Sequence, residues 1–349
     1  MKTSTVSNIA ITNTLRMTMQ NAQKQLMVAN AEATSGQYAD VGLILGSGTA
    51  RSLDLGSDVS RIDSLMDTNA IATQRLESSQ SALDSMANAA QSINEALIAL
   101  SGSDDAASIA VANQTVSNAL ATFTNAANTS VNGEYLFAGI NTDVQPLDDY
   151  ATPDSTAKAA FDQLLGDYMT ANGIATKADF TAEQMATFID GTLTPAFTGD
   201  DWKTNWSDAS DTNITSRISK SEVVATSTNA NSDGMRYFAL ASVMSMELMT
   251  PEFSSAARSV ASDKAVSAIG QAISGIDGQR SQLGLSESRV SKANDALDAQ
   301  KNIIENYLTD LKGVDVTEAA TRVQNLKTLL ETSYTLTSQI QGLSLLNYL

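Results

Sequence analysis

The chain has 349 residues, which is long enough for two or three domains with a sizeable core, and it carries 39 acidic against 21 basic side chains, a net charge of −18. It has no cysteine, which excludes disulfides and Cys-ligated metal sites. It also has no histidine, which removes the commonest general base. We therefore expect no cofactor. So large an excess of negative charge argues against nucleic-acid binding and against binding to an anionic membrane.

The sequence has neither a membrane-spanning run nor a recognisable leader. There is no stretch of 18 apolar residues, so we expect no membrane insertion. Residues 1–8 lack a continuous apolar segment, so we expect no cleaved signal peptide. These features fit a cytoplasmic protein, and equally one that is exported by a route that uses no such signal.

The first 35 residues predict a helix that packs along a partner helix. Its apolar residues follow a 4-3-4-3-4 spacing, which places them on one face. They are Leu15, Met19, Ala22, Leu26, Ala29 and Ala33. Thr34-Ser35-Gly36 ends the pattern, and further glycines keep it broken to Thr49. Within that break, Gly46-Ser47-Gly48 lacks the residues that complete a phosphate-binding loop and is interpreted as a turn.

Two further helices and a short strand follow. Residues 58–100 repeat apolar positions every seven residues, which predicts a long helix with a coiled-coil seam. That seam is Ile62, Asn69, Leu76, Leu83, Ala90 and Leu97. After a turn at 101–105, which supplies an N-cap, residues 106–132 predict a second helix. Residues 133–140, bounded by glycines, predict a short buried strand.

Residues 141–254 differ from both flanks. They hold all four prolines, both tryptophans, and 17 acidic against 6 basic side chains. We expect helices over 157–172 and 181–189, the second begun by a capping box of Thr181 and Gln184. We also expect strands within 214–226 and a methionine-rich buried helix over 235–249. Its methionines could form a soft binding surface, but filling of the core is favoured.

The C-terminal part returns to long helices. Residues 254–311 predict one helix with strict seven-residue steps at its end, and Gly313 terminates it. Asp315 or Thr317 then caps a terminal helix. Its apolar stripe has a 4-3-4-3-4-3 spacing and includes one charged residue. The stripe is Arg322, Leu326, Leu329, Ser333, Leu336, Ile340 and Leu343.

Together these elements predict a mainly α fold. It is an elongated rod of long helices, built from both ends of the chain, with coiled-coil-like termini and an inserted α+β domain. We expect terminal polymerisation helices at 1–40 and 312–349, a helical rod domain at 41–140 and 255–311, and an exposed acidic domain at 141–254. We further expect that the rod folds without the inserted domain.

The terminal stripes are the candidate self-assembly interface. Short amphipathic helices are marginal in water without a partner, so these ends either pair or polymerise. The candidate residues are Leu15, Met19, Leu26, Leu326, Leu329, Leu336, Ile340, Leu343 and Leu346. The alternative is that both ends fold back onto the helical core of their own chain.

Three stretches carry a resemblance to a known family. They are the N-terminal Met1-Lys2-Thr3-Ser4-Thr5, the segment Gly133-Glu134-Tyr135-Leu136-Phe137-Ala138-Gly139, and the C-terminus from Asp315 to the ending Ser344-Leu345-Leu346-Asn347-Tyr348-Leu349. With the long helices, they resemble the flagellin superfamily, and within it the hook-associated proteins of the hook–filament junction. The likeness spans about residues 1–140 and 255–349. After the first helix only Ser35-Gly36 of the family's usual segment remains, so contacts made there are not carried over.

The resemblance implies a structural, non-enzymatic subunit of the bacterial flagellum. It would be exported through the flagellar type III channel and assemble as a junction ring between hook and filament. The implied partners are other copies of itself, a neighbouring hook-associated protein, flagellin, and an export chaperone; the implied location is extracellular.

Two alternatives remain. The chain could be flagellin, the filament subunit itself, although the Tyr135–Gly139 segment and the Asn347-Tyr348-Leu349 ending argue against it. Or residues 141–254 could house a hydrolase that uses paired carboxylates, Asp148 with Asp149 or Asp200 with Asp201. Adjacent acids usually point apart, and no nucleophile or metal motif accompanies them.

Overall fold

The computed structural model describes the backbone of residues 3–100 and 105–346, and the side chains of residues 10–100 and 105–340. The chain divides into two compact units, one of residues 1–64 with 297–349 and one of residues 65–296. The mainly α fold is confirmed, and the two longest helices each contribute to both units. The division into three independently folding parts stays a prediction.

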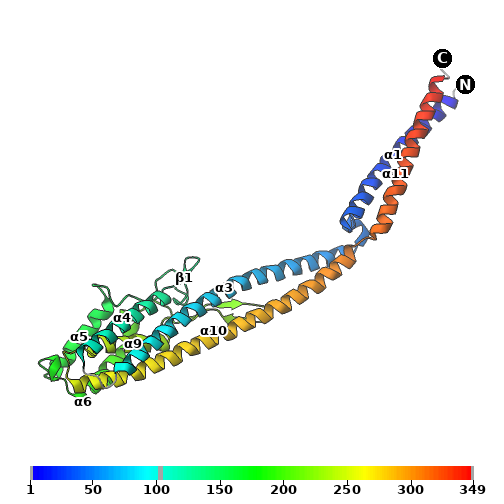
Figure 1. The fold of residues 1–349 in the computed structure, drawn as a ribbon. Helices are drawn as coiled ribbons and strands as arrows, with labels where there is room; N and C mark the ends of the chain where they lie inside the picture. Colours follow the sequence, from blue (N-terminus) through cyan, green and yellow to red (C-terminus); the bar gives the residue numbers. More distant parts are fainter. Residues whose placement is uncertain (1–2, 101–104, 347–349) are drawn as a thin grey trace. The chain divides into compact units, whose positions relative to one another are not determined.

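The first unit is formed by the two ends of the chain. Its elements are α1 (Thr3–Ser35), α2 (Val41–Leu45), the start of α3 (Gly48–Leu100), the end of α10 (Ser255–Lys312) and α11 (Val316–Leu346). Helices α1 and α11 lie side by side (Figure 1). The connections that follow α1 and precede α11 are joined by backbone hydrogen bonds, from Tyr38 N to Lys312 O at 3.0 Å and from Val314 N to Gly36 O at 3.0 Å.

The heptad pattern of α3 corresponds to a buried seam. Each of its six predicted seam residues is at most 1% exposed. The helix starts at Gly48, ten residues before the predicted start, because Gly46 and Ser47 form only a tight turn. On α10, Val290, Leu297 and Ile304 are buried in the same seven-residue steps. The prediction of two long helices with coiled-coil spacing is therefore confirmed.

One polar residue lies within the apolar seam of α3, and its side-chain amide donates two hydrogen bonds. Asn69 is fully buried, and its Nδ2 donates to Asn294 Oδ1 of α10 at 2.7 Å and to the carbonyl of Ile218 at 3.0 Å. A single buried amide in an apolar seam fixes the relative position of two helices, since a shifted pairing would leave it without partners. Farther along, Gln80 Nε2 donates to the carbonyl of Arg280 at 2.8 Å, and Arg280 pairs with Asp84 at 2.8 Å.

The second unit combines the central parts of α3 and α10 with a set of shorter elements. These are α4 (Ala106–Ala127), β1 (Ser130–Val131), β2 (Glu134–Tyr135), α5 (Thr156–Ala171), η1 (Lys177–Asp179), α6 (Ala182–Phe188), η2 (Ile189–Leu193), α7 (Thr194–Thr198), α8 (Asp201–Asn205), β3 (Thr215–Arg217), β4 (Val223–Ala225), α9 (Asp233–Val243) and η3 (Met244–Leu248). Strands β1 and β2 form one antiparallel pair, and β3 and β4 form another. The capping box predicted at Thr181 and Gln184 is present, and Asp105 caps α4 by accepting from Ser108 N at 2.8 Å.

The glycine-bounded segment 133–139 joins the central residues to the helices. Gly133 lies in the tight β1–β2 turn, and Leu136, Phe137 and Ala138 are fully buried. The predicted strand is limited to Glu134–Tyr135, because the buried residues bond instead to a loop: Ala230 N donates to Phe137 O at 2.8 Å. Gly139 has a φ of +64°, and a Cβ there would lie 2.5 Å from the carbonyl oxygen of Ser210. Only glycine fits this close backbone approach.

Residues 141–254 share one hydrophobic core with the long helices. Phe238 of α9 stacks on Phe123 of α4, with ring centroids 3.9 Å apart. The methionines at 235, 244 and 249 are at most 3% exposed, which confirms that they fill the core. One cluster of buried side chains runs from α3 and α4 through the central residues to α10.

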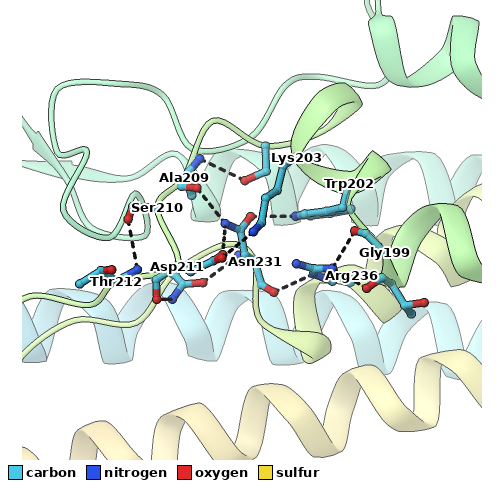
Figure 2. A network of polar contacts seen from close by, with 12 residues as sticks. Gly199, Trp202, Lys203, Ala209, Ser210, Asp211, Thr212, Asn231 and Arg236 are labelled. Atoms are coloured by element: carbon cyan, nitrogen blue, oxygen red, sulfur yellow. Dashed lines mark hydrogen bonds and ion pairs between the residues drawn. The ribbon is translucent and has the colours of Figure 1, made fainter.

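A polar network secures the part of the central residues around α8 and the start of α9 (Figure 2). Trp202 Nε1 donates to Asn231 Oδ1 at 2.9 Å, and Asn231 Nδ2 donates to Asp211 Oδ1 at 2.8 Å. Lys203 Nζ pairs with the same carboxylate at 2.5 Å. Arg236 donates to the carbonyl of Asn231 at 2.7 Å and to that of Thr198 at 2.7 Å. The buried indole and amide therefore have partners, which removes the cost of their desolvation.

The shared core changes what is expected when the central residues are removed. Replacing residues 145–250 with a short Gly/Ser linker should lower the melting temperature and reduce the helical circular dichroism of the remaining helices, because many fully buried side chains are lost at about 1.5–3 kcal/mol each. The matched control inserts the same linker between Asp143 and Val144, which are both exposed. A deletion variant that melts like this control would show that the long helices fold without the central residues, as the sequence alone predicts.

Candidate assembly interface

Helices α1 and α11 meet along a narrow apolar seam. Ala22 and Ala29 of α1 are buried against Leu326 and Leu330 of α11. Met19, Leu26 and Val323 flank this seam and are half-buried. Alanine at successive heptad positions lets the two backbones approach closely, but it buries little apolar surface. The pair therefore has a small core of its own.

Two side-chain contacts cross the seam and show that the helices are antiparallel. Gln23 Nε2 donates to the hydroxyl of Tyr334 at 2.8 Å. Arg322 lies 3.2 Å from the carboxylate of Glu32. The later residue on α1 thus contacts the earlier residue on α11, as an antiparallel pair requires. The sequence predicts Arg322 in the stripe, but not its partner.

The predicted interface residues fall into two groups. Leu15, Met19, Leu26 and Ile340 are half-buried, and Leu326 is 9% exposed. Leu329 and Leu336 are 44% and 46% exposed. The side chains of Leu343 and Leu346 lie outside the described residues. One apolar stripe in the sequence thus corresponds to a seam against α1 and a separate exposed face, which we call the α11 outer stripe (Leu329 and Leu336).

The α11 outer stripe has the spacing of an unpaired coiled-coil seam. Its two leucines are seven residues apart, which places them on the same face of the helix. Helix α1 has an exposed counterpart, Met17 and Val28, which are 65% and 46% exposed. Eleven residues separate these two side chains, which is about three helical turns, so they also share a face. Large exposed apolar side chains in register on a helix favour an interaction surface.

A further set of exposed apolar side chains lies at the other end of this unit. Leu43 and Ile44 of α2 are 80% and 49% exposed, and Leu53 of α3 is 70% exposed. Ile303 of α10 is 70% exposed. Sequence reasoning missed these residues, because α2 is too short for a periodic pattern to be detected. The only available signal was the apolar composition of Val41–Leu45 between glycines.

The start of α11 depends on one carboxylate. Asp315 accepts hydrogen bonds from the backbone N–H of Thr317 at 2.8 Å and of Glu318 at 3.2 Å. These bonds, the one to Glu318 first, hold the pKa of Asp315 below its usual 3.8. Because the pKa is lower in the folded state, the cap stabilises α11 fully above pH 3.8, and this contribution is lost as the pH falls through the folded value.

We therefore expect amide hydrogen exchange at Thr317 and Glu318 to accelerate on acidification, relative to the intrinsic rates of the two amides. Asp315→Asn keeps an acceptor at the cap but cannot titrate, so its exchange should lose this pH dependence. If exchange accelerates equally on acidification in the native chain and in the Asp315→Asn variant, the pH dependence comes from a group other than Asp315.

The acid pairs considered for hydrolysis do not converge on a site. Asp149 accepts the backbone N–H of Ala151 at 2.9 Å and shapes a turn, while Asp200 and Asp201 begin α8. Partial burial, with Asp208 nearby, raises the pKa of Asp148. Within the described residues no group of three or more acidic side chains is placed to hold a metal ion. Nor does any described helix combine the length and the apolarity needed to cross a membrane.

Comparisons with known proteins identify relatives at the level of family and fold. The family profile of the bacterial flagellin N-terminal helical region matches residues 6–142, and that of the bacterial flagellin C-terminal helical region matches residues 266–349. No curated protein matches the sequence.

Three solved structures share the fold at low sequence identity. One is described as a flagellar hook-associated protein from Vibrio parahaemolyticus, with 12% identity, a TM-score of 0.53, and coverage of 76% of this chain and 97% of that chain. Another is FlgL of Bacillus cereus, with 10% identity, a TM-score of 0.50, and coverage of 73% and 99%. The third is flagellar hook-associated protein 3 of Legionella pneumophila, with 10% identity, a TM-score of 0.52, and coverage of 74% and 98%.

Proposed function

The chain belongs to the bacterial flagellin family, and from this premise we propose that it is a hook-associated structural subunit that assembles as a ring at the junction between hook and filament. The observation that carries the proposal is the α1–α11 pair, which uses one apolar face for its own seam and leaves others exposed. Two of the three similar structures are named as flagellar hook-associated proteins and the third as FlgL, and the two hook-associated names support the same assignment.

The exposed faces support assembly from several subunits. The α11 outer stripe and the Met17–Val28 face of α1 are two different surfaces. A contact between two different surfaces is heterologous, and repeated around an axis it generates a ring or a helix of subunits. The terminal segments also carry little net charge, with two acids and three bases in residues 1–40 and three of each in 311–349. Subunits can therefore pack their ends together without strong mutual repulsion.

In this role the chain acts through contacts and not through chemistry. Its partners are other copies of itself, a neighbouring hook-associated protein on one side and flagellin on the other. It reaches the outside of the cell through the flagellar export channel, and an export chaperone covers its apolar ends before assembly.

Deletion of the gene tests the proposal. Electron microscopy of the deletion strain should show hooks without filaments, and unassembled filament subunit should accumulate in the medium. Expression of the intact chain from a plasmid is the control and should restore filaments. Filaments that persist with altered shape would contradict the junction role and favour the alternative that the chain is flagellin.

A further inference from the structure

A polar cavity lies in the second unit, between the start of α9 and the middle of α10. Its volume is 530 Å³, which is within the range of small-molecule sites, about 300–1,000 Å³. Parts of three segments line it: the loop 211–213, residues 228–236 that lead into α9, and residues 275–282 of α10. Every lining residue is polar, charged or glycine. Such a wall excludes a lipid or another apolar ligand, because burying these groups against apolar atoms is unfavourable.

Two polar groups in the wall of this cavity have no partner among the described residues. Gln279 of α10 is 7% exposed, and its Nε2 donates to Thr228 Oγ1 at 2.6 Å, but its Oε1 accepts no hydrogen bond. The buried hydroxyl of Ser232, at the N-cap of α9, is likewise unpaired. Turning the Gln279 amide over would leave its nitrogen unpaired in place of its oxygen. Since unpaired buried polar groups are destabilising, the cavity favours an occupant that forms hydrogen bonds.

The charges around the cavity disfavour an ionic ligand. Asp211 is already paired with Lys203 at 2.5 Å and accepts a hydrogen bond from Asn231 at 2.8 Å (Figure 2). Arg236 also lines the cavity and would repel a cation, whereas the carboxylates of Asp211 and Asp233 would repel an anion. The cavity therefore suits a neutral ligand.

We propose that this cavity binds a neutral saccharide unit. Sugar hydroxyls both donate and accept hydrogen bonds, so they can pair with Ser232 and with either atom of the Gln279 amide. Asp233 and Gln282, which line the cavity, are exposed, so the cavity opens to solvent and admits either a free sugar or one unit of a glycan chain. All of the lining residues belong to the second unit. The site is therefore a property of the central residues and goes beyond the proposed role in assembly.

A glycine in the wall provides a variant that fills the cavity. At Gly278 an added Cβ would meet nothing within 4 Å, so a leucine there extends into the cavity without displacing the backbone. Gly270, earlier in α10, also has nothing within 4 Å of an added Cβ, and it does not line the cavity. Gly278→Leu and Gly270→Leu are therefore the same change on one helix, inside and outside the site. A second variant, Gln279→Met, keeps a long side chain but removes the amide.

Saturation-transfer NMR of the purified full-length chain measures the binding. The probes are glucose, galactose and N-acetylglucosamine as free sugars, and maltotriose and chitotriose as short glycan chains. At least one probe should bind the native chain and Gly270→Leu equally. Gly278→Leu and Gln279→Met should each weaken that binding about tenfold, which corresponds to about 1.4 kcal/mol. Binding confined to a trisaccharide would identify a glycan chain as the ligand, and binding of a monosaccharide would identify a free sugar.

Three results would overturn the proposal. One is that no probe binds the native chain, and another is that binding persists in Gly278→Leu or in Gln279→Met, since the open wall and the unpaired amide carry the argument. The third is a rise in melting temperature with calcium chloride alone that Gly278→Leu abolishes, which would identify a cation site instead. Melting curves without a probe show that each variant is folded. Since no measurement needs a flagellum, the outcome is independent of the deletion experiment that tests the proposed function.

Discussion

Leu336→Asp is expected to leave the isolated chain folded and to prevent its assembly. The native side chain belongs to the α11 outer stripe and is 46% exposed, so the change should alter the free energy of unfolding by no more than about 0.5 kcal/mol. In the ring that we propose, that face is covered by a neighbouring subunit. The variant then loses the burial of a leucine, about 1.5–3 kcal/mol, and in addition buries an unpaired charge.

Two matched variants show whether the effect belongs to this face. Thr335→Asp adds the same charge one residue away at an exposed position, and it should still assemble. Leu330→Asp places the charge in the α1–α11 seam, where the side chain is 7% exposed, and it should loosen the terminal pair of the isolated chain. The readouts are the amount of exported chain in the medium, filament growth by electron microscopy, and thermal melting. Early melting of Leu336→Asp as a monomer would contradict the assignment of its face to assembly.

Gly275→Ala is expected to destabilise the second unit strongly. Gly275 of α10 faces Gly234 at the start of α9, and a Cβ added there would lie 2.5 Å from the Gly234 Cα and 2.7 Å from its nitrogen. Both neighbours are backbone atoms and cannot move aside as a flexible side chain would. Overpacking in a core costs about 1–3 kcal/mol, and we expect the upper end of this range. For a unit of this size, 1 kcal/mol lowers the melting temperature by about 2–4 °C.

The same helix provides the control. At Gly270 an added Cβ would meet nothing within 4 Å, and the residue is in a regular helical conformation. Gly270→Ala should therefore stabilise the unit slightly, by about 0.5–1 kcal/mol, through the lower conformational entropy of the unfolded chain. Opposite signs for the two substitutions, measured by thermal unfolding, are the expected result. Equal effects would show that α9 and α10 do not approach each other at these glycines.

The sequence predicts the long helices well because their periodicity is strong. In α3 the seven-residue spacing predicts a buried seam, and every member of it is buried. The Thr181–Gln184 capping box and the buried methionines of α9 and η3 are confirmed for the same reason: each has a local pattern with one physical meaning. Elements such as α7, α8 and the π-helical turn η2 were missed, because they are five residues long and depend on tertiary packing.

The candidate interface was predicted only in part. The spacing identifies an apolar stripe on α11, but it does not show which residues of the stripe face α1. Leu326 and Leu336 are equivalent in the pattern, yet one is buried in the seam and the other is exposed. Glu32 was missed because a single acid beside alanines has no periodic signal; its isolation as the only acid in α1 was the available clue. Packing between segments that are distant in the sequence decides which stripe residues are buried and which are exposed. A local sequence pattern carries no information about that packing.

The contacts between α1 and α11 also set an order of events in folding. Gln23 and Tyr334 are 311 positions apart, and Glu32 and Arg322 are 290 apart. Contacts of such long sequence separation carry a large loop-closure entropy and form late. Helix α1 precedes α11 in the chain, so its apolar face stays uncovered until α11 has been synthesised. A chain truncated before α11 cannot complete the pair, so the finished terminal surface shows that α11 has been synthesised.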